Sequence, residues 1–369
     1  MNMFLRAAAA VAAIALAGAA LAGCASSSTD ATASGGTDTG AKRIKFVING
    51  TLGDKSFFDS AQAGLDEIAD EYGYEVQTIE LGSERTKWAP GFEDAAAAGD
   101  YDIFVAGTFD AVDFISTLAP QYPDQDFWLF DATADYDGVN GGCSNDCENV
   151  YSITFKQNEA GYLAGYMAAG TLAAGTLPGA EDATKAGVIG AVEIPVIADF
   201  LVGFEAGFEA GGGSSSDVLS QYIGGSLPFA DAPRAKEIAT SMYGQGAGIV
   251  WPVAGSSGFG VFEAAVEQER YAFGIDSDQS ETLEKPEQQE RVITSILKNV
   301  GAALVDAAQR DADGDLPYGT SESLGLKEGA VGYVDNAQYE QFVPQNVRDE
   351  VVEISTQIAD GSITVPSAF

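Results

Sequence analysis

The stretch IKFVINGTLGDKSFFDSAQAGLDEIADEYGYEVQTIEL, residues 44–81, decides the fold because it changes from strand to helix and back to strand. Residues 44–48 are a short apolar run that predicts a buried strand, and residues 74–81 predict another. Between them, residues 60–73 place small and apolar side chains on one face of a helix, namely Ala61, Leu65, Ile68 and Ala69. This order is typical of a parallel sheet covered by helices.

The same alternation continues along the chain in two series. Four strand-and-helix units run to about residue 132, and a second series begins with the small-residue-rich helix pattern NEAGYLAGYMAAGTL. The sequence therefore predicts an α/β protein with two similar lobes, each a doubly wound parallel sheet. Such sheets bind ligands beyond the carboxyl ends of their strands, so the loops that follow strands are the candidate site.

The N-terminus has the pattern of a secretory signal. Arg6 precedes an apolar run that ends in LAGC, residues 21–24, and the run is shorter than the roughly 20 residues that a membrane span needs. Cysteine after Leu-Ala-Gly resembles the bacterial lipobox, which implies a signal peptide over residues 1–23 and a diacylated Cys24. Residues 24–43 lack apolar bulk and predict a flexible tether. An ordinary signal with a chance cysteine is the alternative.

The composition excludes several function classes. A formal net charge of −37 would repel nucleic acid and anionic lipid headgroups. The chain has no His, so Ser-His-Asp triads, Cys-His pairs and His-based metal sites are ruled out. Cys143 and Cys147 lie in GGCSNDCEN, where an oxidising exterior favours a local disulfide over a metal site.

Polar residues follow the strands of the first series. Asn49 offers a donor and an acceptor, and Asp54 is an acceptor suited to ligand hydroxyls, although it could instead cap the next helix. Phe57 or Phe58 could present a ring to a ligand, while the other packs in the core. Asp131 ends the apolar run FWLFD with no helix pattern after it, which favours a ligand site.

The second series offers a similar set. Trp251 lies near the end of an apolar strand, and Gly255 begins a small, open turn that suits a planar ligand better than a phosphate. Asp276 ends another apolar strand, and Lys298 lies near the start of a helix. One cation opposite several carboxylates can hold an uncharged polar ligand. Alternatively, Lys298 is exposed to solvent and has no role in binding.

Seven motifs in order resemble the basic membrane protein family, bacterial lipoproteins that bind substrates, above all purine nucleosides, for ABC transporters. They are GDKSFFDSAQAGL, ITFKQNEAGYLAGYMAA, FLVGFEAGFEAG, AGSSGFGVFEAA, GIDSDQ, VITSILK and LGLKEGAVGYV, between about residues 44 and 335. The resemblance implies a type I periplasmic-binding-protein fold, two lobes joined by a three-segment hinge. We expect hinge segments near residues 151–154, 291–295 and 323–326.

The family site, as the resemblance implies it, holds the base between two rings and the ribose with carboxylates and a lysine. Matched by motif, these are Asp54 with Phe57 or Phe58, then Asp131, Trp251, Asp276 and Lys298. This chain departs from the family pattern at Phe58, where relatives carry Asn, and in the CSNDC insert. The first departure affects the base preference.

These observations predict a nucleoside-binding lipoprotein of an ABC importer, a monomer that delivers its ligand to a membrane permease from outside the cytoplasm. We expect no enzymatic activity and no cofactor; a nucleoside hydrolase would need a tighter Asp cluster. The N-terminal lobe is expected over residues 44–153 and 294–323, and the C-terminal lobe over 154–293 and 324–369. A simple sugar, a flavin-like ligand or a sensing receptor remains the alternative.

Overall fold

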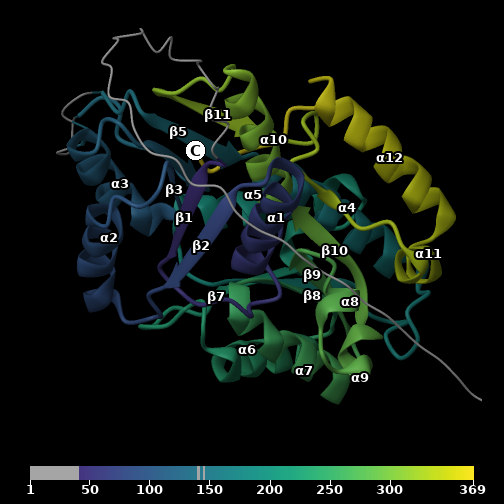
Figure 1. Cartoon of the computed structure of the whole chain (residues 1–369). Coiled ribbons are helices and arrows are strands. Elements are labelled where there is room, and N and C mark those ends of the chain that lie inside the picture. The colour runs from purple at the N-terminus through teal and green to yellow at the C-terminus, as the bar shows by residue number, and fades with distance from the viewer. Residues whose placement is uncertain (1–40, 139–141, 144–145) are drawn as a thin grey trace, which may run out of the picture. The chain divides into compact units, whose positions relative to one another are not determined.

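The computed structural model describes residues 41–138, 142–143 and 146–369, which form two six-stranded sheets with helices on their faces (Figure 1). The expected signal peptide and Cys24 lie outside the described residues. No helix in the described part of the chain is long and apolar enough to cross a membrane.

The first sheet is parallel throughout. Its strands, in spatial order, are β11 (Thr320–Leu324), β5 (Val150–Phe155), β4 (Asp126–Phe130), β3 (Ile103–Gly107), β1 (Arg43–Ile48) and β2 (Glu75–Glu80). Strands β3 and β4 are wholly apolar and buried apart from Asp126, as expected for strands covered on both faces.

The second sheet has the same plan with one exception. Its order is β12 (Val331–Tyr333), β10 (Val292–Lys298), β9 (Tyr271–Asp276), β8 (Ala247–Val253), β6 (Lys185–Gly190) and β7 (Val218–Tyr222). Strand β12 pairs antiparallel with β10, so this sheet is mixed and not fully parallel as expected. Strand β10 leads out of this lobe and β12 leads back into it, hence their opposite directions.

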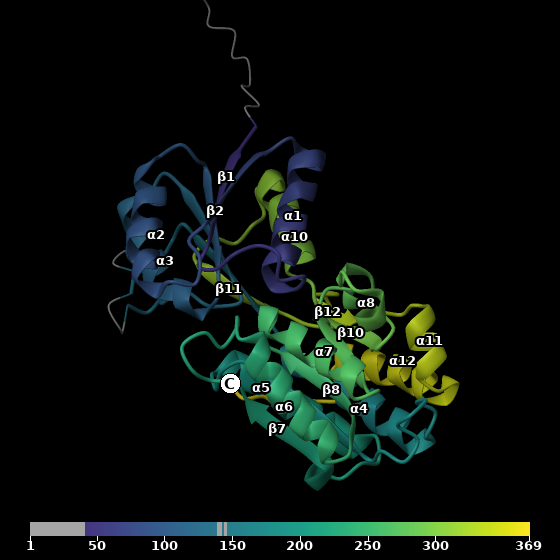
Figure 2. The ribbon, with the colours of Figure 1, turned by 90° about the horizontal axis from the view of Figure 1, so that it is seen from below.

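The helices divide between the sheets (Figure 2). Around the first lie α1 (Phe57–Tyr72), α2 (Trp88–Ala97), α3 (Val112–Leu118) and α10 (Val300–Asp313). Around the second lie α4 (Gln157–Ala174), α5 (Pro195–Ala210), α6 (Ala232–Gly244), α7 (Phe259–Glu267), α8 (Gln279–Thr282), α9 (Pro286–Gln289), α11 (Ala337–Phe342) and α12 (Gln345–Ala359). Helix α1 begins three residues before its expected start, so Phe57 and Phe58 form its first turn.

The chain crosses between the sheets three times, from β5 to α4, from β10 to α10 and from β11 to β12. All of β10 lies in the second sheet, so the lobe boundary expected at residue 294 falls inside a strand. Gly64 of α1 and Gly301 of α10 touch through their backbones, with no room for a Cβ on Gly64. This close approach joins a late helix to the first lobe.

Helices α4 and α5 pack closely through glycines. A Cβ on Gly161 or Gly165 would collide with carbonyl oxygens of α5, and one on Gly207 would collide with the Tyr162 carbonyl. Backbones in direct contact leave little freedom for sliding, so α5 is fixed against α4. Helix α5 carries Phe200, which lines the cavity described below.

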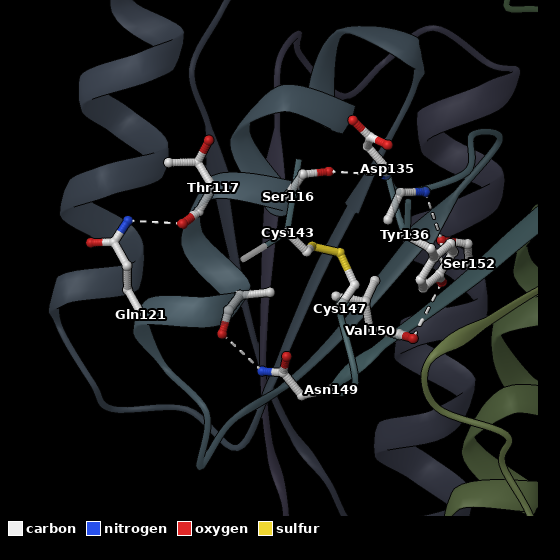
Figure 3. The surroundings of a disulfide bond; sticks show 12 residues. Ser116, Thr117, Gln121, Asp135, Tyr136, Cys143, Cys147, Asn149, Val150 and Ser152 are labelled. Atoms are coloured by element: carbon white, nitrogen blue, oxygen red, sulfur yellow. Dashed lines mark hydrogen bonds between the residues drawn. A yellow bond between two sulfur atoms is a disulfide. The ribbon is translucent and has the colours of Figure 1, made fainter. Parts of the chain in front are cut away.

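A disulfide joins Cys143 and Cys147 in the connection between β4 and β5 (Figure 3). Next to it, the side-chain amide of Asn149 donates to the carbonyls of Ala119, Tyr122 and Gln125, at 3.1, 3.1 and 2.8 Å. These bonds hold the end of the connection against the segment between α3 and β4, and the disulfide closes the connection on itself.

Candidate functional site

A cavity of about 580 Å³ opens between the lobes, at the carboxyl ends of the strands of both sheets. The loops after β1, β2, β3 and β4 line it from one lobe, and the loops after β6, β7 and β8 together with the last residues of β9 and β10 line it from the other. This is the place where open α/β sheets bind ligands.

A second hollow of about 590 Å³ lies beside α10 and β11. Among the described residues that line it, the one cation is Arg310, which already pairs with Glu322 at 2.7 Å and with Asp306 at 3.5 Å. The end of β11 contributes Ser323 and Leu324 to this hollow, whereas the interlobe cavity gathers strand ends from most of both sheets, so the interlobe cavity is the candidate site.

A buried charge cluster forms one end of the cavity. Lys298 Nζ, at the end of β10, donates to Asp131 Oδ1 at 2.8 Å across the two lobes. Ser56 Oγ of the first lobe donates to the carboxylate of Asp276 at the end of β9. Both carboxylates and the ammonium are almost fully buried. Buried charges persist only when they are paired, and here each pair joins one lobe to the other.

Burial sets the protonation of these acids. Loss of solvent raises the pKa of Asp131, although the Lys298 charge opposes that rise. Loss of solvent likewise raises the pKa of Asp276 to about 6, and the neighbouring Asp54 and Asp131 charges add to the rise. The Lys298 charge and the Ser56 hydrogen bond oppose this rise, but the pKa of Asp276 stays above that of an ordinary Asp.

Three strand-end residues in the cavity region have left-handed backbones: Thr108 at φ 79°, Asp131 at φ 60° and Asp276 at φ 63°. Residues other than glycine rarely adopt this conformation, and it concentrates at functional sites. The turn after each strand places the side chain at the cavity end of the sheet.

Asp54 lines the cavity, but its carboxylate is already occupied. Oδ1 accepts the backbone N–H groups of Ser56 at 3.0 Å and Asp59 at 3.2 Å, and Oδ2 accepts that of Phe58 at 2.9 Å. These bonds satisfy donors at the start of α1 and hold the loop. In this structure Asp54 therefore caps helix α1, which is the alternative to a ligand contact that the sequence left open.

Asn49 has a different role in the wall. Its amide nitrogen donates to Thr108 Oγ1 at 2.8 Å, while its buried Oδ1 has no partner within the described residues. A buried acceptor without a partner is costly, so a ligand donor would be stabilised there.

Phe57 and Phe58 both line the cavity. The Phe57 ring lies 5.4 Å from the Phe130 ring, and Lys298 Nζ lies 4.8 Å from the Phe57 centroid. Phe58 packs against Gly50, where a Cβ would come within 2.7 Å of its ring. The two rings touch each other with centroids 5.2 Å apart.

Trp251 does not reach the cavity, which corrects its expected role. It is 0% exposed, and its indole Nε1 donates to the Gly274 carbonyl at 3.1 Å. Its ring packs against Phe200 and Phe204 of α5 at 5.6 and 5.7 Å. Strand β8 extends two residues past it, so the indole fills the space beneath a helix. Gly255, after the strand, does line the cavity, at φ 51°.

Sequence reasoning missed several residues of the wall, namely Arg85, Trp88, Phe109, Asp110, Phe200, Leu227 and Phe229. All except Phe200 belong to segments that follow β2, β3 or β7 at the cavity edge. The sequence feature that could have identified them is their position directly after predicted strands. Arg85 stacks over the Trp88 ring at 4.7 Å and pairs with Asp110.

The sheet order divides the cavity into two ends. Strands β4, β9 and β10 lie next to the crossing segments and carry Asp131, Asp276 and Lys298; we call this the hinge end. Strands β2, β3, β6 and β7 lie farther out; the residues after them include Trp88, Phe109, Val192, Leu227 and Phe229, and we call this the outer end. Three strand spacings separate β4 from β2, about 14 Å. The hinge end combines these buried charges with the rings of Phe57 and Phe200, and the outer end combines apolar side chains with the charged pair of Arg85 and Asp110.

Comparisons with known proteins agree with this architecture. A family model described as ABC transporter substrate-binding protein, PnrA-like, matches residues 41–367. Basic membrane protein A of Borreliella afzelii is 28% identical over 334 residues, 90% of this chain and 93% of that protein. The ABC transporter nucleoside-binding protein BmpA of Lactococcus lactis subsp. cremoris is 33% identical over 354 residues, 90% and 91% of the two chains.

A solved structure supports the fold. The ABC transporter solute-binding protein from Aeropyrum pernix K1 superposes with a TM-score of 0.74 at 24% identity, covering 88% of this chain and 94% of that one. At this identity the similarity concerns the fold alone. The expected two-lobed, type I periplasmic-binding-protein fold is confirmed.

Proposed function

Because the chain belongs to the PnrA-like family of ABC transporter substrate-binding proteins, we propose that its cavity binds a purine nucleoside. The family resemblance read from the sequence is confirmed, and members of this family bind substrates for transporters and are not enzymes. Substrate-binding proteins of importers act outside the cytoplasm.

The division of the cavity into a hinge end and an outer end is the observation that carries the proposal. A nucleoside has a ribose rich in hydroxyl groups and a flat apolar base. The ribose would lie at the hinge end, where the carboxylates of Asp131 and Asp276 can accept its hydroxyl donors and Lys298 can donate. The base would lie at the outer end, between a ring of the first lobe, Phe58, and Phe229 of the second.

The energies suffice for such a ligand. Micromolar binding needs about 8 kcal/mol. Each stacked ring contributes roughly 1–3 kcal/mol, and each hydrogen bond to a charged group about 1.5–3 kcal/mol. Two rings and three such bonds cover the requirement and leave a margin for lobe closure.

Closure of the lobes is the proposed mechanism. Ser56 to Asp276 and Lys298 to Asp131 are contacts between lobes, and the Lys55 carbonyl accepts Ser277 Oγ at 2.8 Å. A ligand that bridges the same groups stabilises the closed form, which a permease can then distinguish from the open form. In this proposal the mature protein is a monomer held to the membrane by lipid on Cys24, and its lobe boundaries lie after β5, β10 and β11, each a few residues past the expected position.

Calorimetric titration of the mature protein with guanosine, inosine, adenosine, ribose and riboflavin tests the proposal. We expect micromolar or tighter binding of purine nucleosides and at least 100-fold weaker binding of ribose. Tightest binding of a sugar or riboflavin would replace the nucleoside with the alternative ligand. No binding of any of the five would favour a different substrate or a sensing role.

A further inference from the structure

Arg85 and Asp110 form a donor and acceptor pair at the outer end of the cavity. Arg85 lies in the short 3₁₀ turn after β2 (Arg85–Lys87), and Asp110 in the one after β3 (Phe109–Ala111). Strands β2 and β3 flank β1, so the pair spans the end of β1. Both residues line the cavity.

The pair keeps binding capacity toward the cavity. Arg85 Nη2 donates to Asp110 Oδ1, and no other hydrogen bond of either side chain is found within the described residues. The remaining guanidinium donors and Asp110 Oδ2 are therefore available. The Trp88 ring under the guanidinium, 4.7 Å away, and the bond from Trp88 Nε1 to the Gly82 carbonyl at 2.8 Å fix the position of Arg85.

The two members of the pair lie at different distances from the hinge end. Asp131 follows β4, Asp110 follows the neighbouring strand β3, about 5 Å away, and Arg85 follows β2, three strand spacings or about 14 Å away. A nucleoside with its ribose at Asp131, Asp276 and Lys298 would extend its base from the hinge end toward the outer end. The edge of the purine farthest from the ribose, with positions 1, 2 and 6, would then face Arg85 and Asp110.

We propose that Arg85 and Asp110 recognise the 6-oxo edge of the base and make the protein prefer guanosine, then inosine, over adenosine. This inference rests on the proposed function. Guanine presents an acceptor at O6 and donors at N1 and N2, which match a guanidinium beside a carboxylate. Inosine lacks the N2 donor. Adenine presents a donor at position 6 and an acceptor at N1, the reverse order.

The surrounding charges support this choice of ligand. Loss of solvent raises the pKa of Asp110, so this carboxylate is poorly hydrated and gains from ligand donors. The lining carries the acids Asp54, Asp110, Asp131 and Asp276 against the cations Arg85 and Lys298. A phosphorylated nucleotide would meet this excess of negative charge, whereas an uncharged nucleoside does not.

Titration of the wild type and of Asp110→Asn with guanosine, inosine and adenosine tests the proposal. We expect wild-type protein to bind guanosine about tenfold or more tightly than adenosine, since a bidentate base contact discriminates on this scale. In Asp110→Asn this preference should shrink to about threefold or less, through loss of guanosine affinity. Thermal unfolding of Asp110→Asn beside the wild type shows whether the variant is folded.

Asp113→Asn is the matched control, because Asp113 lies three residues farther on, is exposed and does not line the cavity. Arg85→Gln should weaken guanosine and inosine together, since both carry O6. Equal or tighter adenosine binding by the wild type, or an unchanged preference in Asp110→Asn, would overturn the inference and leave the proposed function standing. Failure of all three nucleosides to bind would instead overturn the proposed function.

Discussion

The two ends of the cavity are built in different ways. At the hinge end, Asp131, Asp276 and Lys298 are buried and bound to one another or to Ser56 across the lobes. At the outer end, Phe109 and Phe229 are 38% and 37% exposed. Groups at the hinge end are needed for folding and closure, whereas those at the outer end are free to change. The contrast suggests that the hinge end recognises what all ligands share and the outer end distinguishes between them.

Replacing Lys298 should have the largest effect, because it leaves two buried carboxylates without a cation. We expect Lys298→Met to lower the free energy of unfolding by about 3–5 kcal/mol and nucleoside affinity by roughly 100-fold. Chemical denaturation and calorimetric titration measure both. Lys327→Met, at an exposed position, is the control for charge. Unchanged affinity in Lys298→Met would remove Lys298 from the ligand site.

Removing an outer ring should affect affinity but not stability. Phe229→Ala should weaken guanosine binding by roughly 1–3 kcal/mol, about 5- to 150-fold. The melting temperature should stay within about 2 °C, because the ring is partly exposed. The control is Phe369→Ala, at an exposed ring remote from the lining residues. A large loss of stability without loss of affinity would show that Phe229 is a packing residue.

The next largest effect should be the pH dependence of stability and ligand affinity, which arises from Asp276 at the hinge end. The pKa of Asp276 is raised to about 6, so the folded protein holds this proton more tightly than the unfolded chain does. Its contribution to stability therefore increases as the pH falls from 6 toward 4. Ligand affinity should change the other way, falling by up to about tenfold per pH unit below 6, because ribose hydroxyls need the carboxylate.

Asp276→Asn should bind more weakly at pH 7.5 and lose most of this pH dependence. Titrations between pH 5 and 8 give both profiles. If ligand affinity changes equally with pH in the wild type and in Asp276→Asn, another group is responsible for the pH dependence.

Trp251→Phe should have the smallest effect on affinity, within about twofold, since the indole packs under α5 and not in the cavity. Loss of its hydrogen bond and part of its volume should still lower stability by about 1–3 kcal/mol. Titration and thermal unfolding give the two values. A tenfold loss of affinity at full stability would return Trp251 to the ligand site.

The sequence predicted the hinge end better than the outer end, for a physical reason. Asp131 and Asp276 stand out because each interrupts an apolar strand, and a charge there needs an explanation. Arg85 and Phe229 follow more polar strands, in the turns LGSER and GGSLPF, where a charged or aromatic residue is not unusual.

The prediction that Trp251 faces the ligand is wrong for two reasons. Side chains alternate between the two faces of a strand, and the sequence does not show at which residue the strand ends. Asp54 shows the opposite difficulty. An acid before a helix can cap it or bind a ligand, and only its hydrogen bonds from the N–H groups of Ser56, Phe58 and Asp59 show the cap.

The three crossings also affect the order in which this protein can fold during synthesis. The first lobe needs α10, which contacts α1 through Gly64 and Gly301, and β11, which covers the edge of β5. Both elements lie beyond residue 299, so this lobe is incomplete until most of the chain has left the ribosome. A chain that stays unfolded for so long suits export in an extended state. Chains stopped at residue 299 should be digested by protease throughout residues 43–155, whereas chains stopped at residue 335 should be protected there.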